Sequence, residues 1–149
     1  MQHHESYRSG LTLVEVIIAT AVFLTAAVGI LYSFAKCLEL NELGRGTTVA
    51  IQSMKNKMET IKSSDFSQIY TTFNNTTFLI TGLNGIGVVY VDNSNAHLLE
   101  VRVVFCWRLP NGRVIGEDLN LNGVLDTGED KNGNGEIDSY AQMVTRIYG

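Results

Sequence analysis

The sequence predicts an α+β protein in which a long N-terminal helix packs on a small antiparallel sheet. Three features predict this class: an apolar run over residues 16–35, an apolar helical stripe that continues to about residue 62, and several β-branched segments after it. A segment rich in Asn, Gly and Asp over 116–138 is expected to be an insertion before the last strand. The 149 residues have room for one domain and one membrane segment.

The apolar run is long enough to cross a bilayer. At about 1.5 Å per residue, a helix over 16–35 spans roughly the 30 Å of a hydrocarbon core. Its hydroxyl residues Thr20, Thr25 and Ser33 are compatible with a helix because they bond to its own backbone. A secretory signal peptide fits less well, because the run is too long and no small-residue cleavage site follows it.

The helix is expected to continue to about Lys62, with one apolar face in the domain core. That face carries Leu40, Leu43, Ala50, Ile51, Met54, Met58 and Ile61. Gly44 and Gly46 each cost about 1 kcal/mol in a helix interior, which predicts a kink or a melted stretch beside them. The segment 66–75 is expected to be a connecting loop with a little structure.

Four segments have the composition of strands: 77–81, 86–91, 98–107 and 141–148. In the third, residues alternate in character, so one face is expected to pack on the helix and the other to be partly solvated. The first face carries Val101, Val103, Phe105 and Trp107, and the second carries Arg102, Val104, Cys106 and Arg108.

The net acidity of the chain lies in the segment 116–138. Seven acidic residues and one lysine give this segment a charge of −6, whereas the whole chain carries −4. The remainder is therefore slightly basic. This distribution favours a cation site in the segment and argues against a nucleic-acid-binding surface.

Residues 118–129 fit the twelve-residue calcium-loop template at every constrained position. Side-chain oxygens fall at positions 1, 3, 5, 9 and 12, Gly123 occupies the sharp turn at position 6, and position 7 offers its backbone carbonyl. The predicted ligand residues are Asp118, Asn120, Asn122, Val124, Asp126 and Glu129. We expect Ca²⁺ rather than Mg²⁺, which prefers to keep its waters.

A second copy of the template begins at once, with predicted ligand residues Asp130, Asn132, Asn134, Glu136 and Asp138. Its twelfth position would be Ala141, so we expect a half-loop that binds more weakly or shares ligands with the first; one or two Ca²⁺ ions are predicted. Since no helices flank them, the loops resemble the tandem loops of dockerin-type and thrombospondin-type repeats. An ordinary solvated turn is the alternative, but a twelve-residue offset argues against chance.

The stretch Ser9-Gly10-Leu11-Thr12-Leu13-Val14-Glu15 comes just before the apolar run. A short polar leader ends in Gly, and a carboxylate follows one helical turn into the membrane segment. This pattern resembles the processing site of type IV prepilins and pseudopilins, with Leu11 in place of the usual Phe. The resemblance covers roughly the first 35 residues; the strand pattern around Trp107 is weakly similar to that of minor pilins and minor pseudopilins.

The resemblance implies a pilin-like fold, cleavage between Gly10 and Leu11 by prepilin peptidase, and N-methylation of Leu11. It divides the chain into a leader (1–10), a transmembrane and fibre-core helix (11–35) and a globular domain (36–149). The implied partners are prepilin peptidase, other pilin or pseudopilin subunits and the inner-membrane assembly platform. The implied location is the bacterial inner membrane, with the leader cytoplasmic, and then a periplasmic pseudopilus or an extracellular pilus.

A lone carboxylate in hydrocarbon needs a cation, which makes Glu15 a candidate functional residue. The resemblance implies that this cation is the amine of Leu11 in a neighbouring subunit, and that Glu15 acts in assembly. Stabilisation of its own helix N-terminus is the alternative.

Catalysis is not expected, because the sequence has no nucleophile elbow, phosphate loop or zinc spacing, and His97 is the only histidine after the leader. Cys37 and Cys106 are expected to be small buried residues, with a disulfide left open. Two other functions remain open: a membrane-anchored calcium-binding module that never polymerises, and an adhesive tip subunit.

Overall fold

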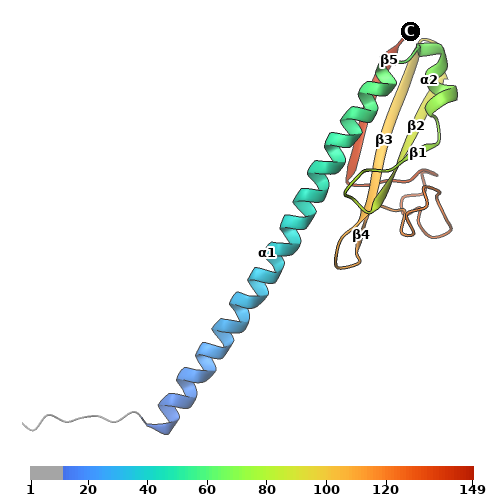
Figure 1. Ribbon diagram of the computed structural model, residues 1–149. Coiled ribbons are helices and arrows are strands. Elements are labelled where there is room, and N and C mark those ends of the chain that lie inside the picture. Colours follow the sequence, from blue (N-terminus) through green and yellow to red (C-terminus); the bar gives the residue numbers. More distant parts are fainter. Residues whose placement is uncertain (1–11) are drawn as a thin grey trace, which may run out of the picture. The chain divides into compact units, whose positions relative to one another are not determined.

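The computed structural model describes residues 12–149. In chain order their elements are α1 (Leu13–Lys62), α2 (Phe66–Phe73), β1 (Thr76–Phe78), β2 (Gly85–Asn95), β3 (Leu98–Arg108), β4 (Val114–Ile115) and β5 (Ala141–Tyr148) (Figure 1). This order confirms the predicted α+β class. The chain divides into two compact units, Met1–Leu40 and Asn41–Gly149, which are described in turn.

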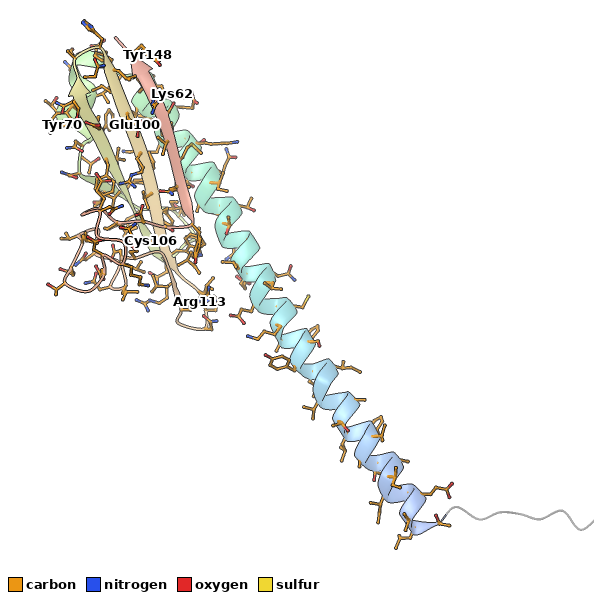
Figure 2. All side chains as sticks on the ribbon, turned by 180° about the vertical axis from the view of Figure 1, so that it is seen from behind. Lys62, Tyr70, Glu100, Cys106, Arg113 and Tyr148 are labelled. Carbon is orange, nitrogen blue, oxygen red and sulfur yellow. The ribbon has the colours of Figure 1, made fainter. Side chains whose placement is uncertain are left out.

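The described part of the first unit is the apolar half of α1. This helix is long and apolar enough to cross a membrane, and no residue of its most apolar 18-residue window is buried. Figure 2 shows side chains standing out all round this half of the helix. The hydroxyls of Thr20, Thr25 and Ser33 each donate to the carbonyl four residues earlier, at 2.5–2.9 Å. The polar interruptions are therefore satisfied without solvent.

In the second unit, the end of α1 supplies the helical side of the main core. Ala50, Met54, Met58 and Ile61 are buried there, as the stripe predicted, whereas Leu40 and Ile51 are exposed. The expected kink or melted stretch is absent, since α1 continues through Gly44 and Gly46. Tertiary packing explains why a glycine stands at one of the two positions, because Gly46 is buried against Trp107 of β3.

The segment after α1 is a helix, so the prediction of a loop over 66–75 is wrong. α2 buries Ile69, and Phe66 and Phe73 pack against the same core from one helical face. The spacing of these three residues suits a helical stripe. A helix of eight residues has little stability alone, so the burial of this stripe is what favours it over an irregular loop.

The sheet is antiparallel throughout. β1, β2 and β3 are neighbours in sequence order, and the far edge of β3 is shared by β5, which pairs with 98–105, and β4, which pairs with Trp107 and Arg108. β4 was not predicted from the sequence. With only two residues, it is too short to leave a strand pattern.

Both faces of β3 are covered over residues 103–107. Val101, Val103, Phe105 and Trp107 lie in the main core with α1, as predicted. The opposite face was expected to be partly solvated, but Val104 and Cys106 are each 1 % exposed. They pack against Ile137 of the insertion, which forms a third layer beside the sheet. In Figure 2 the insertion crosses the sheet near Cys106.

Candidate metal centre

The first turn of α1 is capped by reciprocal hydrogen bonds between Thr12 and Glu15. The backbone N–H of Thr12 donates to Glu15 Oε2 (3.2 Å), and the backbone N–H of Glu15 donates to Thr12 Oγ1 (3.3 Å). Such a capping box satisfies two N–H groups that the helix leaves free. Glu15 thus contacts its own helix terminus in the described chain. Gly10 and Leu11, the expected sites of cleavage and methylation, lie outside the described residues.

In the first loop (118–129) the polar side chains are joined by hydrogen bonds within the loop. The carboxylate of Asp118 at position 1 accepts the backbone N–H groups of Asn122 (3.1 Å) and Gly123 (2.7 Å). The side-chain amides of Asn120 and Asn122 donate to one oxygen of Asp126 at 2.7 and 2.8 Å. The side chains of positions 3, 5 and 9 therefore meet at one point.

The second loop (130–138) repeats these contacts. Asp130 accepts the backbone N–H groups of Asn134 (3.2 Å) and Gly135 (3.0 Å). The amides of Asn132 and Asn134 donate to one oxygen of Asp138 at 2.6 and 2.7 Å. Two segments of different sequence thus adopt one hydrogen-bonding pattern, offset by twelve residues.

The backbone of the two loops matches as well. Position 4 is left-handed in both, with φ of 60° at Leu121 and 73° at Gly133, and so is position 6, with 78° at Gly123 and 77° at Gly135. Gly123 has a second reason to be glycine, because a Cβ there would lie 2.6 Å from Cγ2 of Thr77 on β1. The first loop is therefore seated directly against the sheet.

Glu129, at position 12, closes the first loop. Its Oε1 accepts the backbone N–H of Leu119 at 2.8 Å, and its Oε2 accepts that of Asp126 at 3.0 Å. The carboxylate thereby links positions 2 and 9. Each predicted side-chain ligand of the first loop thus takes part in a hydrogen bond within the loop, and Val124 at position 7 is expected to contribute only its main chain.

The second loop is closed by Glu117, a residue that lies before the first loop. Glu117 Oε1 accepts the backbone N–H of Lys131, and Oε2 that of Asp138, both at 3.2 Å. These are again positions 2 and 9. Ala141, which is the twelfth position of the linear template, instead begins β5 and pairs with Phe105. Sequence reasoning missed Glu117, although a signal exists: the dipeptide Glu-Asp recurs at 117–118 and 129–130.

Three carboxylates of this segment are buried. Asp118, Glu129 and Glu117 are 0 %, 5 % and 9 % exposed. Within residues 12–149 none of the three forms an ion pair, whereas Arg102 of β3 pairs with Glu136 and with Asp138, the latter at 3.0 Å. Burial of a charge costs free energy unless it is compensated, so the donor set favours a bound cation.

The available donors suit a hard cation that is bound by oxygen. Within the described residues no group of three His, Cys, Asp or Glu side chains is close enough to hold a metal by itself. Calcium loops, however, draw part of their ligands from Asn side chains and backbone carbonyls. Each loop here offers Asp, Asn and main-chain oxygens. Neither loop contains the Cys sulfur or His nitrogen ligands that transition metals favour.

Apolar residues at position 8 attach both loops to the outer face of the sheet. Ile137 is buried among Val88, Val104 and Cys106, and Leu125 packs against the same cluster. The backbone N–H of Ile137 also donates to the hydroxyl of Tyr90 at 2.9 Å. Burial raises the pKa of Tyr90, and it raises the pKa of Cys106 from 9.0 to about 11.

The remaining candidate residues lie apart from this centre. Cys37 is exposed and Cys106 buried, and both are free thiols, so the expectation of two buried cysteines holds for Cys106 alone. His97 is exposed in the turn between β2 and β3. That the chain is not an enzyme stays a prediction.

Comparisons of the chain with protein-family models, with curated proteins and with solved structures found no match. The likeness of the first 35 residues to prepilins therefore stays an interpretation of those residues.

Proposed function

We propose that the chain is a structural subunit of a type IV pilus or of a type II secretion pseudopilus. In this proposal prepilin peptidase cleaves it between Gly10 and Leu11, and Leu11 is then N-methylated. The subunit begins in the bacterial inner membrane and passes into a periplasmic pseudopilus or an extracellular pilus. Its partners are the assembly platform and other subunits of the fibre.

One observation carries the proposal: the apolar half of α1 has no buried side chain in its most apolar window. Exposed large side chains recur on every side of it, including Ile17, Phe23 and Phe34. Such a surface needs either lipid or other helices around it. A membrane followed by the packed core of a fibre would supply both in succession.

Glu15 is the proposed assembly residue. Its carboxylate is exposed beside Thr12 at the start of α1. Among apolar helices it would be costly without a cation, and the amine of a neighbouring subunit's Leu11 has the required charge. This pairing would set the register between adjacent helices. The capping box is compatible with it, because a carboxylate accepts several hydrogen bonds.

In the second unit we propose that the two loops bind Ca²⁺. An ion would be held by the oxygens of Asp118, Asn120, Asn122, Val124, Asp126 and Glu129 in the first loop. It would supply positive charge to a segment of net charge −6 and cross-link its residues. Extracellular calcium modules bind at about 10⁻⁴–10⁻³ M, so the loops would fill only after export.

The proposal is tested by the intact mass and N-terminal residue of the protein extracted from the membranes of its own host. A chain that starts at Leu11 and carries one extra methyl group would support processing as a pilin. A chain that still starts at Met1 would contradict it, and would favour a membrane-anchored calcium-binding module that does not polymerise. An adhesive tip subunit would instead require binding of the protein to cells or glycans that chelator abolishes.

A further inference from the structure

The two loops are interlocked by their closing carboxylates. Glu117 directly precedes Asp118, the first residue of the first loop, yet its carboxylate closes the second loop. Glu129 closes the first loop and directly precedes Asp130, the first residue of the second. Each Glu-Asp pair therefore contributes to both loops.

We infer that Glu117 is the twelfth-position ligand of the second loop, so that the chain holds two Ca²⁺ ions in two complete loops. This inference rests on the calcium binding proposed above. It replaces the half-loop that the linear template predicts, because position 12 is supplied in space by a residue thirteen positions before Asp130.

The hydrogen bonds of Glu117 are those of a closing residue. Both of its oxygens accept main-chain N–H groups, from positions 2 and 9 of the second loop, as both oxygens of Glu129 do in the first. A carboxylate that spans these two positions is placed to bind an ion in bidentate fashion, which is the role of the twelfth residue in calcium loops.

Burial is an independent reason to assign a cation to Glu117. Its side chain is 9 % exposed, and within residues 12–149 no Lys, Arg or His pairs with it. Arg102 neutralises Glu136 and Asp138, but it forms no ion pair with Glu117. A carboxylate that is removed from water without a counter-charge is destabilising, and an ion in the second loop would remove that penalty.

Interlocking predicts positive cooperativity between the two ions. An ion bound through Glu117 and Asp138 would join the two ends of the segment 117–138, which contains the whole first loop. The backbone N–H of Glu117 already donates to the carbonyl of Asp138 at 2.8 Å. The ion that binds first would pay the entropy of ordering this segment, so the second would bind more tightly.

The test is a calcium titration of the full-length protein in detergent by isothermal calorimetry. The unchanged protein is expected to bind two ions with a Hill coefficient above one. Glu117→Gln keeps the size of the side chain but removes the charge, and is expected to bind one ion. Glu59→Gln, an equal charge change at an exposed position of α1, is the matched control and is expected to retain two.

A structural role of Glu117 is distinguished by unfolding in calcium and in chelator. If Glu117 only supports the turn, Glu117→Gln lowers the urea midpoint equally in both; as a ligand it lowers the midpoint further in calcium. Glu117→Asp, which keeps the charge but shortens the reach, is a second variant and is expected to weaken the second ion at least ~10-fold, the loss seen even for supporting groups.

Two ions in Glu117→Gln with unchanged affinity would overturn the inference, as would a single ion in the unchanged protein that is unaffected by the substitution. Either result leaves calcium binding in place. Absence of any calcium binding would instead refute the proposed calcium function, and the inference would fall with it.

Discussion

The indole of Trp107 occupies the space where a side chain at position 46 would begin. A Cβ on Gly46 of α1 would lie 2.7 Å from Nε1 of Trp107 on β3. The indole N–H is buried and finds no hydrogen-bond acceptor among the described residues. The ring thus packs closely against helix backbone that carries no side chain. The same packing leaves the indole N–H unpaired, which costs about 1–3 kcal/mol.

This relationship predicts opposite effects of alanine at two nearby glycines. Gly46→Ala is expected to destabilise the second unit, because the overpacking cost of about 1–3 kcal/mol exceeds the gain of about 1 kcal/mol in helix propensity. Gly44→Ala has nothing within 4 Å of its Cβ and is expected to stabilise by up to about 1 kcal/mol. Urea unfolding followed by the fluorescence of Trp107, the single tryptophan, measures both. Equal effects of the two substitutions would contradict the packing argument.

Calcium is expected to stabilise the second unit and to hold β5 on the sheet. The insertion ends at β5, so an ordered insertion restrains the strand that pairs with 98–105 of β3. At a calcium concentration one hundred times the dissociation constant, each site adds about 2.7 kcal/mol. Unfolding in calcium and in chelator measures the total stabilisation free energy. Amide hydrogen exchange over 141–148 reports how firmly β5 is held on the sheet.

Magnesium at the same concentration is the control for ionic strength, and is expected to give a smaller shift. An unchanged urea midpoint in chelator would contradict the prediction.

The thiol of Cys106 is expected to resist alkylation in the folded protein. Burial by the insertion raises its pKa to about 11, so at pH 8 roughly one thousandth is the reactive thiolate. Mass spectrometry after treatment with iodoacetamide should find label on the exposed Cys37 and not on Cys106. If the loops bind calcium, chelator is expected to speed the labelling of Cys106, since loss of the ions would loosen the covering layer. Equal labelling of both thiols in calcium would argue against that cover.

Stability is expected to fall as the pH rises from about 9 to about 11. Well below the unfolded chain's pKa of 9.0, the Cys106 thiol is protonated in both the folded and the unfolded chain and contributes no pH dependence. Above it the unfolded chain loses the proton that the folded chain keeps, which costs up to about 1.4 kcal/mol per pH unit. The pKa of Tyr90 is also raised, so it acts in the same direction at higher pH. Cys106→Ala is the control, and its unfolding free energy should decline less over this range.

Two substitutions separate the proposed roles of Glu15. Glu15→Gln keeps the capping box with Thr12, because Gln serves at that position as Glu does, but it removes the charge. If the charge pairs with a neighbouring subunit, Glu15→Gln and Glu15→Ala both leave leader cleavage intact and abolish entry into the fibre. Immunoblots of sheared fibres and of membranes from the host measure the two steps. Normal incorporation of Glu15→Gln would assign the residue to its own helix instead.

Much of the fold could be predicted because its signals are local. The apolar run and the stripe through Met54 and Met58 fix α1, and alternation from Val101 to Trp107 fixes β3 and the face that meets the helix. The failures have two causes. α2 and the covered outer face of β3 depend on burial against distant parts of the chain, as of Val104 against Ile137, and single-segment patterns do not contain those contacts. β4 differs, because two residues are too few to leave a strand pattern.

The sequence by itself determined the candidate ligand types and the spacing of the two loops, since a period of twelve with Asp, Asn and Gly at set positions is a property of the chain alone. Only the tertiary structure decided how the second loop is closed. A carboxylate closes a loop by its position in space, and the path of the chain brings Glu117 to the backbone of Lys131 and Asp138 from outside the linear template. The same holds for Gly46. Its cost in a helix is a local property, but the need for a glycine at this position comes from the ring of Trp107, which packs against it.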